Sequence, residues 1–243
     1  MHWLIKHLVN QTLKLVSYTL PMALHLQVYM AIKPLIRLLP LGQAVTPHYF
    51  QWCEFFADDA FTSLGMQLEW PGYIHPDMHK GLFMFNNKQD FLKAMRPWWN
   101  TGFQIHVHSN GSGGNQITLD ALEILQAGHP RFNHRFTLEH FGISSTAQGR
   151  QVKALGALVS TNPYFVSDRA DINANQIGTD RASLVARITS LIDQDVVVAL
   201  YSDTPVGVPS PLLEVWIAVN RVGNPSREKF MPLMNELEMS IKR

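Results

Sequence analysis

The chain has 243 residues, of which 46% are hydrophobic, enough for one domain with its own core, and we expect residues 1–243 to form a single domain. Twenty basic and nineteen acidic side chains leave a net charge of +1, and no basic stretch stands out, which argues against a nucleic-acid partner. The single cysteine, Cys53, excludes an intrachain disulfide and a multi-cysteine metal cluster, and we expect a cytoplasmic location.

The first forty residues are the most apolar part of the chain. Residues 15–32 carry no charged side chain, and this run is long enough to be a transmembrane candidate. Pro21, His25 and Gln27 lower its hydrophobicity. We therefore prefer a helix over residues 3–18, a buried strand over 22–29 and a short helix that ends near Pro40, and we keep membrane attachment as the alternative.

From residue 50 onward, strand patterns alternate with helix patterns. The expected strands cover residues 50–56, 103–109, 135–140, 157–161 and 196–201. The expected helices cover residues 88–100, 119–127, 144–155, 181–193 and 211–222, with long loops at 57–88 and 162–180. Such alternation is typical of a parallel α/β sheet. The apolar run at 196–201 predicts a strand that is buried on both faces.

Three residues that could bind a metal stand at the ends of expected strands. They are His108, His140 and Asp203. One βα unit of a TIM barrel takes roughly 30 residues, so His140 follows His108 by one unit and Asp203 follows His140 by two. These side chains would then lie on one rim of such a barrel. Imidazole and carboxylate groups that converge from separate strands are what a metal site needs.

Each of these positions also has a structural interpretation. A carboxylate at the end of an apolar strand needs a partner or a metal ion, so we interpret Asp203 as functional. For His140, a role as ligand and a structural role stay equally open. Glu54 lies among aromatic residues, and for it a functional role and a solvent-facing position stay equally open. His106 is interpreted as a buried packing residue. The glycine-rich turn at 109–114 is only a weak signal for phosphate binding. Histidines in loops are expected at the surface: His75, His79, His129 and His134.

Taken together, these strand ends resemble the amidohydrolase 3 family of the metal-dependent amidohydrolase superfamily, which includes enzymes such as N-substituted formamide deformylase. The resemblance rests on the ordered combination of FADDAF at 56–61, PGY at 71–73, QIHVHSNG at 104–111, HRFTLEHF at 134–141, NPY at 162–164 and SDTP at 202–205. It covers roughly residues 50–222 and implies a partial TIM-like (β/α) barrel of about strands 3 to 8.

The resemblance also implies a site and a reaction. His108, His140 and Asp203 would be the metal ligands of strands 5, 6 and 8, and Glu54 would stand where a lysine bridges two metal ions. Asp203 would in addition take a proton from the metal-bound water and pass it to the leaving amine. We expect one or two divalent ions, with zinc as the expected metal, and hydrolysis of a non-peptide C–N bond in a small-molecule amide or formamide.

Two further expectations concern the completeness of the site and its contacts with substrate. The family's His-x-His pair of strand 1 has no counterpart in the sequence, so the alternative is an inactive fragment, or a subunit that needs another chain or a second copy. Substrate contacts are expected from the loops at 57–88 and 162–180 and from positions beside them, with Asn110, Tyr164 and Arg181 as candidates.

Overall fold

The computed structural model of the protein describes residues 51–74 and 80–221. The helix, strand and short helix predicted for residues 3–40, and the uncharged run at 15–32, lie outside this part. The chain divides into two compact units, residues 1–54 and 55–243. Because nearly all of the first unit lies outside the described residues, the expectation of a single domain stays a prediction.

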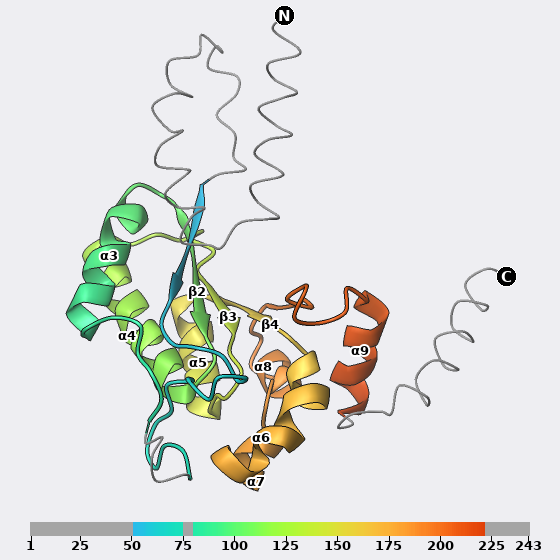
Figure 1. Cartoon of the computed structure of the whole chain (residues 1–243). Helices are drawn as coiled ribbons and strands as arrows, with labels where there is room; N and C mark the ends of the chain where they lie inside the picture. Colours follow the sequence, from blue (N-terminus) through green and yellow to red (C-terminus); the bar gives the residue numbers. More distant parts are fainter. Residues whose placement is uncertain (1–50, 75–79, 222–243) are drawn as a thin grey trace, which may run out of the picture. The chain divides into compact units, whose positions relative to one another are not determined.

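Five strands and the helices between them make up the described part (Figure 1). The strands are β1 (Trp52–Phe56), β2 (Gln104–Ser109), β3 (Thr137–His140), β4 (Leu158–Thr161) and β5 (Val198–Leu200). The helices are α3 (Lys88–Asn100), α4 (Ser112–Gly128), α5 (Thr146–Leu155), the π-helix η2 (Phe165–Arg169), α6 (Ala170–Ile177), α7 (Thr179–Ser183), α8 (Ile188–Ile192) and α9 (Pro211–Asn220).

The strands form one sheet in the order β1-β2-β3-β4-β5, which is also their order in the sequence. The pairs β2–β3, β3–β4 and β4–β5 are parallel. The predicted parallel α/β fold is therefore confirmed. A barrel fragment from strand 3 to strand 8 has six strands, and β1 to β5 correspond to the last five of them. The sixth, predicted at residues 22–29, falls outside the described residues.

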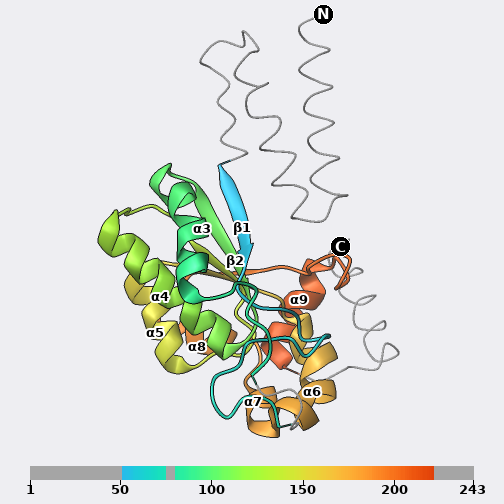
Figure 2. The same ribbon diagram turned by 60° about the vertical axis from the view of Figure 1, so that its left-hand side comes forward.

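The two faces of the sheet differ in chemistry because side chains alternate along each strand. One face carries the fully buried Ile105, Val107 and Leu138, and helices α3, α4 and α5 lie along it in both views (Figures 1 and 2). The other face carries His108 and Glu139, which are partners in the β2–β3 register and only partly buried. His108 and Glu139 therefore share the face that these helices do not cover.

Strand β5 differs from its prediction. The run at 196–201 was expected to be buried on both faces, but only Val198–Leu200 form a strand, and Val197 is 64% exposed. Val196, in contrast, is buried. In β5 itself Val198 and Leu200 are partly buried and Ala199 is exposed, so the prediction of a strand buried on both faces is wrong.

Helix α4 begins earlier than predicted, at Ser112 and not at Leu119, because the glycine-rich turn forms its first turn. The N–H groups of Gly113 and Gly114 donate to the carbonyl oxygen of Gln67 at 2.8 and 3.0 Å. A Cβ atom on Gly111 would lie 2.2 Å from the same oxygen, so glycine is required there. The donors that suggested a phosphate site are thus used by the chain's own backbone.

Buried Asp58 holds the same junction together. Its carboxylate accepts hydrogen bonds from the backbone N–H groups of Gln67, Asn110 and Gly111 at 2.9, 2.8 and 2.7 Å. Burial raises the pKa of Asp58 to about 7, although these three donors act in the opposite direction. The loop after β1 is therefore fixed to the carboxyl end of β2, where His108 lies.

The region after β4 is more helical, and more broken, than predicted. The expected loop at 162–180 contains η2 and α6, and the single helix expected at 181–193 is divided into α7 and α8. Ala186, between them, has a φ of 48°, and its carbonyl accepts from Arg221 at 2.8 Å. Because Arg221 lies far away in the sequence, the local pattern could not predict the break.

No helix within residues 51–74 and 80–221 combines the length and the apolar character that crossing a membrane requires.

Candidate functional site

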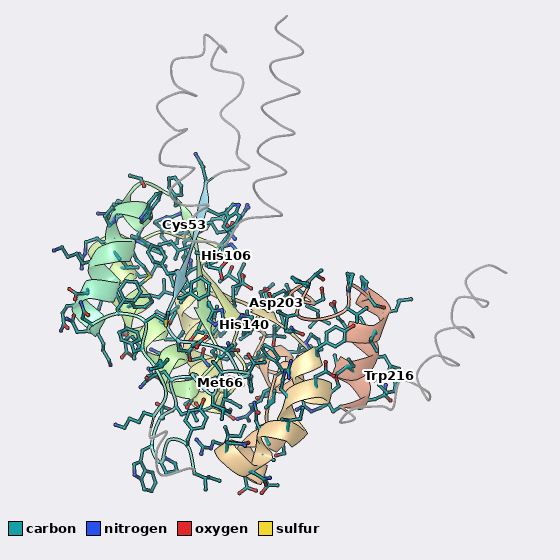
Figure 3. The ribbon with its side chains drawn as sticks, viewed as in Figure 1. Cys53, Met66, His106, His140, Asp203 and Trp216 are labelled. Atoms are coloured by element: carbon teal, nitrogen blue, oxygen red, sulfur yellow. The ribbon has the colours of Figure 1, made fainter. Side chains whose placement is uncertain are left out.

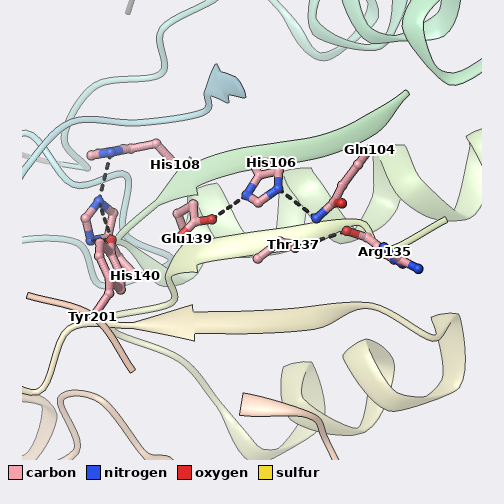
Figure 4. A network of polar contacts seen from close by, with 8 residues as sticks. All are labelled: Gln104, His106, His108, Arg135, Thr137, Glu139, His140 and Tyr201. Carbon is pink, nitrogen blue, oxygen red and sulfur yellow. Dashed lines mark hydrogen bonds and ion pairs between the residues drawn. The ribbon is translucent and has the colours of Figure 1, made fainter. Parts of the chain in front are cut away.

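Two histidines meet at the carboxyl ends of neighbouring strands. His108 is the fifth residue of β2, and His140 is the last residue of β3. His108 Nδ1 and His140 Nε2 are 3.0 Å apart, and the two rings meet edge to face with their centroids 4.4 Å apart (Figure 4). His140 has a φ of 70°, an uncommon conformation for a residue other than glycine. The structure therefore brings together two of the four predicted metal ligands.

The His108 ring is held on both sides. Phe56 stacks against it with the ring centroids 4.6 Å apart, and Asn110 Nδ2 lies 3.1 Å from its Nε2 atom. Burial lowers the pKa of His108 to about 4, and the nearby Asp59 only partly opposes this shift. His108 is therefore neutral at pH 7.

His140 is almost completely buried, with 4% of its surface exposed. Tyr201 Oη lies 2.6 Å from its Nδ1 atom, and Phe165 lies beside the ring. Burial, and then the neighbouring His108, lower the pKa of His140 well below its usual value. Both imidazoles are therefore neutral, which is the form that binds a metal ion.

The spacing of the two rings suits a divalent metal ion. Zinc–nitrogen bonds are about 2.0–2.1 Å long, so two nitrogens on one tetrahedral ion lie roughly 3.3 Å apart. The observed 3.0 Å between His108 Nδ1 and His140 Nε2 is close to that value. Among the residues that the structure describes, however, no group of three or more His, Cys, Asp or Glu side chains is placed to hold a metal. The pair is thus a two-donor site.

Asp203 follows β5, at the same end of the sheet as the histidines (Figure 3). Its backbone has a φ of 56° and its side chain is partly buried. Burial, and then the charge of Glu139, raise the pKa of the Asp203 carboxyl. Glu54 is the central residue of β1 and is also partly buried. The roles of Asp203 as ligand and base, and of Glu54 as ligand, stay predictions.

The three predicted substrate contacts have partners within the chain. Asn110 is 1% exposed and its amide lies between His108 and Asp59. The Tyr164 hydroxyl donates to the Val208 carbonyl at 2.9 Å. Arg181 donates to the Gly72 carbonyl. Their contacts with a substrate stay predictions.

A second polar cluster lies on the same face of the sheet, farther from the strand ends. His106 Nδ1 is 2.5 Å from Glu139 Oε1, and Gln104 Nε2 is 2.8 Å from His106 Nε2 (Figure 4). His106 therefore pairs with Glu139 and not with the His108–His140 pair. Glu139 was not singled out from the sequence, although alternation from buried Leu138 places it on the face of His108.

Tyr201 was also missed. It stands two residues before Asp203, at the end of the apolar run, and nothing in the local sequence distinguishes it from a core residue. Its contact with His140 depends on how the ends of β3 and β5 are placed, which is a tertiary feature.

The chain is similar in sequence to known proteins. The profile described as "Amidohydrolase family" matches residues 48–235. The chain is 30% identical over 121 residues to the N-substituted formamide deformylase of Arthrobacter pascens. It is 29% identical over 123 residues to the protein LONG AFTER FAR-RED 3 of Arabidopsis thaliana. The first match covers 49% of this chain and 22% of the relative, and the second covers 50% and 21%.

Solved structures show the same fold. An uncharacterized metal-dependent hydrolase from Pyrococcus furiosus aligns with a TM-score of 0.61 at 22% identity, over 70% of this chain and 34% of that protein. A second one, from Pyrococcus horikoshii, aligns with a TM-score of 0.60 at 21% identity, over 70% and 33%. The chain thus spans about a fifth of the matched curated relatives and a third of these structures.

Proposed function

Because the chain belongs to the amidohydrolase family, we propose that it takes part in metal-dependent hydrolysis of a non-peptide C–N bond in a small-molecule amide or formamide. The single observation that carries the proposal is the neutral His108–His140 pair at the carboxyl ends of β2 and β3. The formamide deformylase of A. pascens supports the choice of bond, since it is a relative at 30% identity.

Each residue of the site has a part in this proposal. His108 Nδ1 and His140 Nε2 would hold the ion, and Glu54 and Asp203 would add carboxylate ligands. A bound divalent ion, for which we propose zinc with one or two ions per chain, polarises a carbonyl group and activates water. The Asp203 carboxylate would accept the proton of the attacking water and pass it to the leaving nitrogen. Its raised pKa favours holding that proton between the two steps.

The surroundings of the pair keep it ready for this role. Phe56 and Phe165 pack against the two rings and exclude water from them. Tyr201 fixes the orientation of His140 through its Nδ1 atom. A hydrogen-bond partner of this kind orients the ring of a ligand histidine before the metal binds. The free, buried thiol of Cys53 is compatible with a reducing compartment, and we propose a cytoplasmic location.

The experiment measures zinc binding and hydrolysis on the same protein. Purified chain is titrated with zinc in a calorimeter and assayed against a panel of N-formyl and N-acyl amines. We expect His140→Ala to weaken zinc binding at least tenfold and to abolish hydrolysis. His129→Ala is the control, because His129 is exposed and lies at the far end of α4. Zinc binding and hydrolysis that are unchanged in His140→Ala would refute the proposal.

A second candidate is a chain that binds a metal but does not catalyse hydrolysis without a further chain. One observation favours it, namely that the described residues place only two donors together. The same experiment separates the two candidates. Zinc binding without turnover of any member of the panel supports the second candidate, and turnover that depends on His140 supports the first.

A further inference from the structure

Asn110 is a buried side chain that contacts His108 on the side of the ring that faces away from His140. It directly follows β2 and is 1% exposed. Its Nδ2 atom is 3.1 Å from His108 Nε2 and 3.3 Å from the carbonyl oxygen of Asp59. Its Oδ1 atom is also buried but has no hydrogen-bond partner. A buried acceptor without a partner is costly, so this oxygen calls for an explanation.

The hydrogen bonds around the pair fix where the ring protons are. An amide N–H can only donate, so His108 Nε2 accepts from Asn110 and the proton of His108 is on Nδ1. That Nδ1–H then donates to His140 Nε2 at 3.0 Å, and His140 Nδ1–H donates to Tyr201 Oη at 2.6 Å. The arrangement is consistent, but it places a proton between the two imidazoles.

A metal ion held by the pair needs a different arrangement. It would take the lone pairs of His108 Nδ1 and His140 Nε2, so the proton of His108 would move to Nε2. This Nε2–H would then face the Nδ2–H₂ group of Asn110, and two donors cannot form a hydrogen bond with each other. On the other side of the pair, Tyr201 Oη can accept from His140 Nδ1–H in both states. Only the contact with Asn110 has to change.

We propose that Asn110 is a positioning residue of the metal site, whose side-chain amide turns over when a metal ion binds, so that Oδ1 accepts a hydrogen bond from His108 Nε2–H. The inference rests on the proposed metal-dependent function. The turn gives the unpartnered Oδ1 a donor. In exchange, Nδ2 gives up its contacts with His108 Nε2 and the Asp59 carbonyl and moves to the buried position that Oδ1 occupied. The turn is driven by the removal of the donor–donor contact that metal binding would create. A partner on the far nitrogen of a ligand histidine typically contributes about 10- to 100-fold to metal affinity.

Asn115 provides a matched control for this side chain. It is also fully buried, its Nδ2 atom donates to a backbone carbonyl, that of Ile143 at 2.9 Å, and its Oδ1 atom also has no partner. None of its hydrogen bonds involves His108 or His140. Alanine at either position removes one buried side-chain-to-backbone hydrogen bond, but only at position 110 does it remove a contact with the pair.

The first measurement is the zinc dissociation constant of the full chain by calorimetry, with circular dichroism as a check of folding. We expect Asn110→Ala to raise this constant about 10- to 100-fold and Asn115→Ala to leave it close to that of the wild type. Equal effects of the two substitutions would overturn the inference while leaving the proposed function intact. A wild-type chain that binds no zinc would overturn both.

The second measurement separates positioning from packing. Asn110→Asp keeps an oxygen that accepts from His108 Nε2–H but has no amide to donate, so we expect it to bind zinc more tightly than Asn110→Ala. Nitrogen-15 spectra of the wild type should show His108 protonated on Nδ1 without zinc and on Nε2 with zinc. If Asn110→Ala does not fold, the inference is tested by zinc binding to folded Asn110→Asp and by these spectra. Loss of zinc binding in folded Asn110→Asp, or an unchanged His108 protonation site, would overturn the inference.

Discussion

At the scale of single residues, burial decides what the histidines do. His108 and His140 could be predicted as a pair because both stand at strand ends one βα unit apart. His134 could not, because the sequence places it in a loop and a surface position is the usual expectation there. In the structure it is 2% exposed and packs beside Trp99, which comes from a much earlier segment, the end of α3. Such burial depends on packing between distant segments and leaves no local pattern.

His134 gives a prediction of pH dependence. Its Nδ1 atom accepts from the Phe136 N–H at 2.9 Å and its Nε2–H donates to the Leu155 carbonyl at 3.0 Å, so the folded chain needs the neutral ring. Burial lowers the pKa of His134 below 6.5. Below that pH the unfolded chain binds the proton first, so the free energy of unfolding falls as pH falls.

His134→Gln should therefore lower the free energy of unfolding at pH 7.5 by about 1–3 kcal/mol and weaken its dependence on pH between 7.5 and 5. Urea unfolding at several pH values measures both effects. His129→Gln, at an exposed position, serves as the control and should match the wild type. A pH dependence of His134→Gln as steep as that of the wild type would show that the group does not titrate as described.

At the scale of elements, the sequence predicts the interior of α4 but not its beginning. Apolar periodicity identifies the helix from Leu119, whereas the first turn is made of Ser112, Gly113 and Gly114, which are poor helix formers. The carbonyl of Gln67 and the Ser112 hydroxyl, which accepts from the Glu69 N–H at 3.0 Å, stabilise that turn. Because these contacts join segments that are far apart in the sequence, local propensity could not reveal them.

Glycine at the two ends of α4 gives a paired prediction. Gly111→Ala would place a Cβ atom 2.2 Å from the Gln67 oxygen, so we expect it to lower the free energy of unfolding by about 2–4 kcal/mol. Gly128→Ala meets nothing closer than 3.9 Å and should be neutral or stabilising by about 1 kcal/mol. Chemical denaturation measures both. Equal stability of the two variants would contradict the close contact with Gln67.

At the scale of the whole molecule, alternation of strands and helices was enough to predict a parallel sheet in sequential order. It was also enough to place His108 and His140 at one end of that sheet. The contacts of Glu54 and Asp203 could not be predicted in the same way. Asp203 lies in a segment with a φ of 56°, after a strand of only three residues, so its direction depends on the turn and not on strand alternation.

Metal binding should be visible in the stability of the whole chain. A ligand at 100 times its dissociation constant stabilises the folded state by about 2.7 kcal/mol, which for this size raises the melting temperature by roughly 5–10 °C. We therefore expect added zinc to raise the melting temperature and a chelator to reverse the rise. Differential scanning fluorimetry measures the shift, and His140→Ala should show none. A shift of the same size in His140→Ala would place the zinc elsewhere.

The junction between Gln67 and the start of α4 also has a consequence for the order in which the chain folds. The part of α4 from Leu119 onward has an apolar face and local hydrogen bonds, so it can form early. The turn at Ser112–Gly114 forms later, because it needs its contact with Gln67, which lies far away in the sequence. Closing the loop between these two segments costs entropy before the contact is made. The surroundings of His108 therefore form late in folding. During unfolding, the site should lose its structure before the helix does.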